Sequence, residues 1–284
     1  SATVHRLRVA GVSVSRSSVA EVVVISGFPG CNYGLRGPHV LSSVEILSNS
    51  LHSLRALFVN TMDVLAPQDC FVCGAASRGD AVCPDCVDGL PRRAPTACPQ
   101  CGLPGLDGGR CAACTRTAPA YDATRAAYDF AFPVDALIHA LKYRHRLSIA
   151  TFLGDALAVH GADFGADADL VLPMPLHPQR LAERGFNQAV ELAREFARRR
   201  GLPLALAAVR KVRDLPPQAG LDREARLRSP RGAFEGVQAL DGRRVIVVDD
   251  VMTTGATLNA AAHALREAGA AHITAMVVAR TEPD

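Results

Sequence analysis

The sequence predicts an α/β protein, with a parallel β-sheet flanked by helices and a small cysteine-rich module in front of it. After Tyr121, short runs of β-branched and apolar residues alternate with segments whose apolar residues recur at helical spacing. Strands that alternate with helices favour a parallel sheet with right-handed crossovers. Ahead of this region, eight of the nine cysteines fall within residues 70–114. A chain of 284 residues has room for both parts, since domains commonly take about 100–200 residues.

The first 67 residues divide into two segments of different character. Residues 1–50 contain ten serines and scattered valines without sustained periodicity, which predicts a weakly ordered extension. A start upstream of the natural one is an equal alternative. Residues 51–67 are predicted to form a lead-in helix that ends at Pro67. The apolar residues on one face of this helix are Leu54, Leu57, Phe58, Met62 and Leu65.

Residues 68–118 contain an internal repeat built on Cys-x-x-Cys pairs. The stretches CFVCGAASRGDAVCPDC and CPQCGLPGLDGGRCAAC have equal length, nine residues between their pairs and a glycine after the second cysteine. A two-residue gap lets two thiolates hold one ion, and two such pairs complete a closed tetrahedral zinc site. A double zinc ribbon with two structural zinc ions is therefore predicted. Its candidate ligands are Cys70, Cys73, Cys83, Cys86, Cys98, Cys101, Cys111 and Cys114.

Other readings of these cysteines fit less well. A disulfide framework needs an oxidising compartment, and nothing in the sequence indicates export. A thioredoxin-like redox pair would need one reactive motif, whereas this chain has four in tandem. Equal spacing favours one ion within each repeat, although crossed pairing between the repeats stays open. Segments this short should need the metal to remain folded.

The region 119–284 is predicted to form the α/β domain. Strands are expected at residues 123–130, 170–172, 203–209, 245–248 and 273–278. Helices are expected at residues 134–143, 148–160, 187–200 and 258–268. Residues 210–232 lack a clean periodicity and are interpreted as a mobile basic loop. The outer face of the helix at 187–200 carries Arg194, Arg198, Arg199 and Arg200.

Residues 245–257 are the most informative stretch of the chain. Four β-branched residues predict a buried strand, and Asp249 and Asp250 stand where it ends. The turn and helix N-terminus that follow favour an anion, through free backbone N–H groups and the helix dipole. The carboxylates would repel a phosphate, so they are better placed to accept hydrogen bonds from sugar hydroxyls. A ribose 5-phosphate site is predicted, with a metal site or a helix N-cap pair as alternatives. The predicted phosphate-binding residues are Thr253, Thr254, Gly255, Ala256 and Thr257.

Residues 173–188 form a second constellation, in which the chain leaves a strand through two prolines and enters an amphipathic helix. Arg180 and Arg184 lie four residues apart, and guanidinium groups near a strand end can clamp a diphosphate bidentately. The alternative is a solvated basic turn. The candidate ligand-binding residues here are Pro173, Met174, Pro175, Leu176, Arg180 and Arg184.

Both constellations resemble known signatures. Residues 245–257 resemble the phosphoribosyl-pyrophosphate (PRPP) signature of type I phosphoribosyltransferases, and residues 173–188 resemble the ComF-family motif, in which a Pro-x-Pro strand exit precedes Arg-Gly-Phe-Asn-Gln. The zinc module and the segments at 141–143 and 232–234 match the same family, so that the resemblance covers about residues 54–280. Two positions of the central loop depart from the family pattern: Leu215 lies near where relatives often have Thr, and Ser229 lies where they often have Asn.

The resemblance implies a type I phosphoribosyltransferase fold, with a five-stranded parallel core, helices on both faces and a small hood. It also implies binding of PRPP with Mg²⁺ and a part in natural competence, the uptake of transforming DNA. Retention of catalysis does not follow, because fold and activity separate readily. In a working enzyme, the candidate catalytic residues are Asp249, Asp250 and Arg184, and Lys142 and Tyr143 could reach the ligand from the hood.

Charge and hydropathy limit the remaining choices. The net charge of only +3 makes no global case for nucleic-acid binding, but residues 180–231 hold 13 basic and 6 acidic side chains. An accessory protein that contacts single-stranded DNA or a competence helicase is therefore a second hypothesis. A purely structural zinc adaptor would leave residues 249–257 without a purpose. No apolar run approaches the roughly 20 residues of a membrane span, and the N-terminus lacks a signal-peptide pattern, so we infer a cytoplasmic protein.

Overall fold

The structure is a computed structural model that describes residues 6–9, 12–15, 69–77, 80–94, 96–105, 108–213 and 232–282. The chain splits into two compact units, Ser1–Leu65 and Ala66–Asp284. In the first unit, β1 (Arg6–Val9) pairs antiparallel with β2 (Val12–Ser15). The lead-in helix predicted at 51–67, and the rest of the extension predicted at 1–50, lie outside the described residues.

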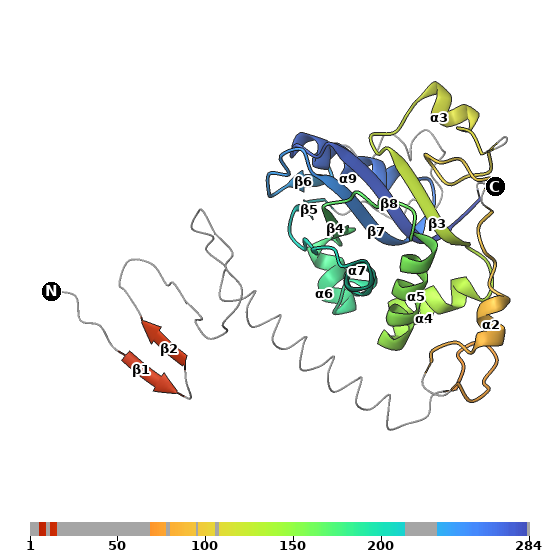
Figure 1. The fold of residues 1–284 in the computed structure, drawn as a ribbon, viewed down its shortest axis with the longest axis horizontal. Coiled ribbons are helices and arrows are strands. Elements are labelled where there is room, and N and C mark those ends of the chain that lie inside the picture. The colour runs from red at the N-terminus through yellow and green to blue at the C-terminus, as the bar shows by residue number, and fades with distance from the viewer. Residues whose placement is uncertain are drawn as a thin grey trace. The chain divides into compact units, whose positions relative to one another are not determined.

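The second unit is built on a four-stranded parallel sheet with strand order β3-β8-β7-β4 (Figure 1). Its strands are β3 (Ala123–Asp129), β4 (Leu170–Pro173), β7 (Arg244–Met252) and β8 (His272–Arg280). The central strands β7 and β8 are nearly continuous apolar runs, as expected for strands that are covered on both faces. The register pairs Pro173 with Val248 and Met252 with Arg280, so all four strands end at one edge.

Helices cover both faces of the sheet (Figure 1). One face carries α4 (Val134–Arg144), α5 (Leu147–His160) and α7 (Gln188–Arg200), and the opposite face carries α9 (Ala256–Glu267). Successive residues of β7 point to opposite faces: Ile246 and Val248 join the core under α5 and α7, whereas Val245 and Val247 join the core under α9. This alternation explains why the strand needs an uninterrupted apolar sequence.

The structure confirms the predicted fold class but corrects two elements. The strand predicted at 203–209 is wrong, because only Leu204 bridges in parallel to Val171. The implied five-stranded core is therefore four strands and a single bridge. The chain then leaves the sheet, and β5 (Val209–Lys211) pairs antiparallel with β6 (Phe234–Gly236) beside α9. Residues 210 and 211 thus belong to a strand, and residues 214–231 of the predicted loop lie outside the described residues.

A helix in the Pro-x-Pro region was not predicted. The segment α6 (Pro178–Arg184) begins directly after the strand exit and ends at Gly185, whose φ is 79°. Pro178 takes the first helical position, where its missing N–H costs nothing. The prolines of this region therefore start a short helix as well as stiffening the strand exit.

The two cysteine repeats fold alike and pack on the α/β domain at different places. The short helices α2 (Pro84–Asp88) and α3 (Ala112–Arg116) each begin directly after the third cysteine of their repeat. The first repeat packs with Cys70, Val82 and Leu90 against the core of α4 and α5. The second repeat lies along β3, where Pro99 accepts a hydrogen bond of 2.9 Å from the Thr124 N–H.

Candidate functional site

The eight predicted metal ligands gather into two clusters, one for each repeat. One cluster contains Cys70, Cys73, Cys83 and Cys86, and the other contains Cys98, Cys101, Cys111 and Cys114. In each cluster the ligand atoms lie within 4.8 Å of one another. Pairing within each repeat is therefore confirmed, and crossed pairing is excluded.

The same hydrogen bonds hold both clusters. The N–H of Cys83 donates to Sγ of Cys70 at 3.3 Å, and the N–H of Cys111 donates to Sγ of Cys98 at 3.3 Å. The Sγ atoms of Cys73 and Cys83 lie 3.7 Å apart, and those of Cys101 and Cys111 lie 3.6 Å apart. Both distances are well beyond a disulfide bond of about 2.05 Å. Four thiols with room between them fit a tetrahedral ion, so each cluster is consistent with one structural zinc ion.

The predicted carboxylate pair lies at the C-terminal end of β7. Asp249 is partly exposed, and its Oδ1 accepts a hydrogen bond of 2.8 Å from the Asp250 N–H. Asp250 is buried, and its Oδ1 accepts 2.7 Å from the Val251 N–H. The two acids therefore differ in access, because only Asp249 offers part of its surface to a ligand.

Lys142, on the last turn of α4, provides the countercharge for this pair. Its Nζ lies 2.6 Å from Oδ2 of Asp250, and the two side chains are 22% and 5% exposed. Burial and the neighbouring Asp250 carboxylate raise the pKa of Asp249 to about 8.

The loop after β7 turns at a glycine and runs directly into the N-terminus of α9. Gly255 adopts a φ of 79° at the N-cap of α9, and the Thr254 hydroxyl accepts a 3.3 Å hydrogen bond from the Ala256 N–H. An alanine side chain at position 255 would meet Cε of Met252 at 2.7 Å and the hydroxyl of Tyr121 at 3.0 Å. Thr253 is exposed and Thr257 is partly buried. Only glycine leaves the backbone free to take this path.

The fold brings the two predicted constellations to the same edge. Pro173 is the register partner of Val248, and the Met174 N–H donates to the Val248 carbonyl at 2.8 Å. Asn187 donates from its amide to the Met174 carbonyl at 3.0 Å and caps α7 by accepting from the Ala189 N–H. The strand exit at 173–176 is therefore fixed beside Asp249. Pro175 and Leu176 are partly buried along this exit.

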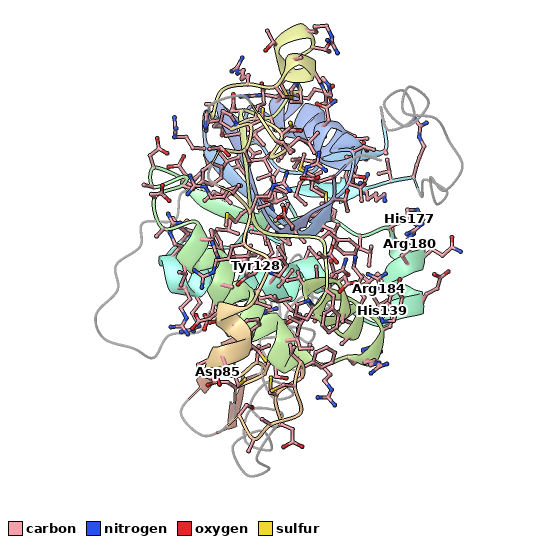
Figure 2. The ribbon with its side chains drawn as sticks, turned by 90° about the vertical axis from the view of Figure 1, so that its right-hand side faces the viewer. Asp85, Tyr128, His139, His177, Arg180 and Arg184 are labelled. Carbon is pink, nitrogen blue, oxygen red and sulfur yellow. The ribbon has the colours of Figure 1, made fainter. Side chains whose placement is uncertain are left out.

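The arginines of α6 lie beyond this exit, toward α4. Figure 2 shows Arg184 near His139, with Arg180 and His177 further along the same side. The guanidinium of Arg184 stacks 5.5 Å from the centre of the Tyr143 ring and donates to the side chain of Gln188. His177 accepts from the Gln179 N–H and so caps α6. Arg184 is held between two helices and is partly exposed.

Comparison with known proteins adds relatives and domain matches to this geometry. Residues 181–283 match the phosphoribosyl transferase domain, and residues 61–115 match the double zinc ribbon domain. DNA utilization protein YhgH of Escherichia coli (strain K12) is 32% identical over 218 residues, which cover 75% of this chain and 90% of that protein. The chain belongs to the ComF/YhgH family.

Two further proteins are similar to parts of this chain. Competence protein F of Haemophilus influenzae is 29% identical over 194 residues, which cover 64% of this chain and 85% of that protein. Adenine phosphoribosyltransferase of Nocardia farcinica is 46% identical over 85 residues, or 28% of this chain and 44% of that enzyme. The family membership confirms the type I phosphoribosyltransferase-like fold with its N-terminal zinc-ribbon module.

The arginines of the basic face predicted on α7 have partners within the protein. Arg198 and Arg199 pair with Glu195 and Asp155, Arg194 lies 3.9 Å from Glu191, and Arg200 donates to backbone carbonyls after α5. Three of these arginines lie beside carboxylates and Arg200 is bonded to backbone carbonyls, so this face offers less unpaired positive charge than the sequence indicates. Among the described helices, none is both long and apolar enough to cross a membrane.

No role was predicted for two residues that contact the loop after β7 in this ComF/YhgH protein. Tyr121 is 3% exposed and backs the loop at Gly255. Arg280 is 2% exposed at the end of β8 and donates to the carbonyls of Met252 and Thr253. A charged residue that ends an apolar strand was the only available signal for Arg280. No pattern marked Tyr121, since its contact joins segments more than a hundred residues apart.

Proposed function

We propose that this ComF/YhgH protein binds PRPP, or a related phosphorylated ribose, at the edge formed by residues 249–257 and 173–176, and that it acts in DNA uptake. The observation that carries the proposal is the placement of Asp249, beside a glycine-capped anion turn and next to the exit of β4. The turn would serve a phosphate, Asp249 would serve a sugar diol, and the exit of β4 would serve a diphosphate. The names of the relatives, DNA utilization protein and Competence protein F, support the biological setting.

Each part of the edge would take one part of the ligand. Thr253 to Thr257 would hold the 5-phosphate, and the partly exposed Asp249 would accept hydrogen bonds from the ribose hydroxyls, with the buried pair of Asp250 and Lys142 behind it. Residues 173–176 and Arg184 would lie by the diphosphate. In a transfer reaction, the catalytic contribution would be to hold the leaving diphosphate rather than to supply a side-chain nucleophile.

A bound Mg²⁺ would neutralise part of the charge on the diphosphate, since it prefers substrate phosphates and water to an all-protein cage. The edge suits that arrangement, because Lys142 already occupies Asp250 and only Asp249 is partly exposed. The protein would orient the ligand through its backbone amides and the carboxylate of Asp249.

Calorimetric titration with PRPP, in the presence and absence of Mg²⁺, tests this proposal. We expect binding by the unmodified chain and a loss of about tenfold or more in affinity for Asp249→Asn, since hydrogen bonds to charged groups contribute about 1.5–3 kcal/mol, and a smaller loss for the buried Asp250→Asn. Release of pyrophosphate against a panel of bases and amines would separate a transferase from a binding protein. Unchanged affinity in both variants would refute the placement of the ribose.

Binding should also depend on pH through Asp249. The ionised carboxylate accepts more hydrogen bonds than the protonated form, so a diol ligand favours ionisation. Because the pKa of Asp249 is raised to about 8, affinity should rise between pH 6 and pH 8, by up to about tenfold per unit. The Asp249→Asn variant should retain only the titration of the ligand's own phosphates, and an identical pH profile in both proteins would contradict this role.

A second candidate function is contact with single-stranded DNA, and a specific surface favours it. A hollow of about 650 Å³ lies between the first zinc ribbon and α4. Its lining includes the rings of Phe71, Phe130, His139 and Tyr143 and the cation Arg144, together with Asp135 and with Lys142, which pairs with Asp250. Nearby, Phe132 is 72% exposed and Tyr143 is 60% exposed. Interleaved rings and cations are what a single strand needs for base stacking and phosphate contact.

Base stacking has little support in the basic stretch at 180–231, which lacks interleaved aromatic residues. The fold supplies rings from other elements instead, and Arg184 and Arg146 stack on Tyr143 and Phe71. Anisotropy titration with a labelled oligothymidine tests this surface. Tyr143→Ala and Phe132→Ala should each weaken binding about tenfold, whereas Val159→Ala, at an equally exposed apolar residue on α5, should not. Equal effects of all three variants, or binding insensitive to salt, would count against the surface.

A further inference from the structure

The second cysteine cluster and the phosphate-binding loop share one buried side chain, Arg280. Its Nε donates to the carbonyl of Cys101 at 2.9 Å, and its Nη1 donates to the carbonyl of Met252 at 2.8 Å and to the carbonyl of Thr253. The residue is only 2% exposed. A single guanidinium therefore bridges a metal-ligand residue of the ribbon and the two residues with which β7 enters the loop.

This bridge sets the direction of the loop's amides. A trans peptide is planar, so that each carbonyl points opposite to the N–H of the next residue. Hydrogen bonds from Arg280 to the carbonyls of Met252 and Thr253 consequently turn the N–H groups of Thr253 and Thr254 away from the guanidinium. The arginine also places a positive charge behind a loop that is proposed to hold a phosphate.

Only the second repeat is connected in this way among the described residues. Gly74 and Gly102 occupy the same position of the two repeats and have φ angles of 73° and 70°. A side chain at Gly74 would meet nothing within 4 Å, whereas one at Gly102 would meet Arg280 and Thr124 at 3.7 Å. Two further hydrogen bonds hold the second ribbon: Gln100 donates to the Tyr121 carbonyl, and Arg93 donates to the Gly102 carbonyl.

We propose that Arg280 is a positioning residue that couples the second cluster (Cys98, Cys101, Cys111 and Cys114) to the loop at 253–257, so that zinc and a ribose 5-phosphate ligand strengthen each other's binding. Zinc orders the ribbon that presents the Cys101 carbonyl. Without that acceptor, Arg280 holds the loop less firmly and the amides lose their alignment. Coupling of this kind is reciprocal. The inference rests on the proposed function for the identity of the ligand.

The affinity arm compares three full-length proteins in calorimetry with Mg²⁺ and PRPP: the unmodified chain, Arg280→Lys and Arg266→Lys. Lysine keeps the charge at position 280 but cannot reach all the carbonyls from one planar fork. Arg266 is the matched control, because it also bridges backbone carbonyls, those of Ala120 and Ala270, at the opposite end of the sheet. We expect affinity to fall about tenfold for Arg280→Lys and to stay within about twofold for Arg266→Lys.

The reciprocal arm follows zinc release to a coloured chelator, with and without saturating ribose 5-phosphate, which lacks the metal-binding diphosphate. In the unmodified chain, the ligand should slow the release of one zinc ion about tenfold and leave the other unchanged. In Arg280→Lys this protection should disappear. A merely structural arginine would not produce a ligand effect confined to one ion.

The two arms separate the failure of this inference from the failure of the proposed function. If the unmodified chain binds neither PRPP nor ribose 5-phosphate, the proposed function fails and the coupling fails with it. If it binds them, but both zinc ions are protected equally or neither is, the coupling is wrong while the binding site stands. Arg280→Lys with unchanged PRPP affinity would overturn the positioning role even if the protein were less stable.

Discussion

Gly255→Ala should lower the free energy of unfolding by about 2–4 kcal/mol and remove measurable binding of PRPP. The φ of 79° at this position costs a residue with a side chain roughly 1–2 kcal/mol. The new methyl would also stand 2.7 Å from Cε of Met252 and 3.0 Å from the Tyr121 hydroxyl, in a buried site where overpacking costs about 1–3 kcal/mol. Relief of these contacts moves the backbone that presents the amides. Thermal or denaturant unfolding and calorimetry measure both effects.

Gly242→Ala is the matched control for this change. Gly242 has nearly the same φ, 78°, but a side chain there would meet nothing within 4 Å. Its variant should therefore lose only the backbone term, about 1–2 kcal/mol, and bind PRPP like the unmodified chain. If both variants lost equal stability and Gly255→Ala still bound PRPP, the close packing of the loop on Met252 and Tyr121 would have no part in binding.

The elements that the sequence predicted correctly are those encoded within one short segment. The strand β7, its two acids and the turn into α9 follow one another within 24 residues, from Arg244 to Glu267. The cysteine clusters were likewise predictable, because equal spacing in two repeats restricts which thiols can meet. In both cases the residues that act together are close in the sequence, so that a local pattern is sufficient to predict their arrangement.

The features that escaped prediction depend on contacts between distant segments. Lys142 reaches Asp250 across 108 positions of the chain, and Arg280 reaches Cys101 across 179. The short helix α6 lacks a Ser, Thr or Asp cap and starts at Pro178, so it resembled an extended exit. The strand expected at 203–209 has the right composition, but the chain leaves the sheet after two hydrogen bonds around Val171 to pack Ala208 and Val209 beside α9. Tertiary packing decided these cases over local propensity.

Because Lys142 is the ion-pair partner of a buried acid, Lys142→Met should lower the free energy of unfolding markedly. It leaves the Asp250 carboxylate, 5% exposed, without its partner at 2.6 Å. Breaking a fully buried ion pair costs about 3–5 kcal/mol, and the 22% exposure of Lys142 lowers our expectation to about 2–3 kcal/mol. Denaturant unfolding of Lys142→Met, Asp250→Asn and the double variant measures the coupling. On the Asp250→Asn background the lysine change should cost much less, because no unpaired charge remains.

The exposed pair of Arg210 and Glu235 provides the comparison for this cycle. Its atoms approach to 2.7 Å, as closely as those of Lys142 and Asp250, but its side chains are 65% and 54% exposed. Solvent screens such a pair, so Arg210→Met should change stability by less than about 1 kcal/mol. A coupling between Lys142 and Asp250 as small as that would mean that the lysine does not hold the acid in place. Asp250 would then be free to turn toward the ribose, and the difference in access between the two acids would no longer assign the sugar contact mainly to Asp249.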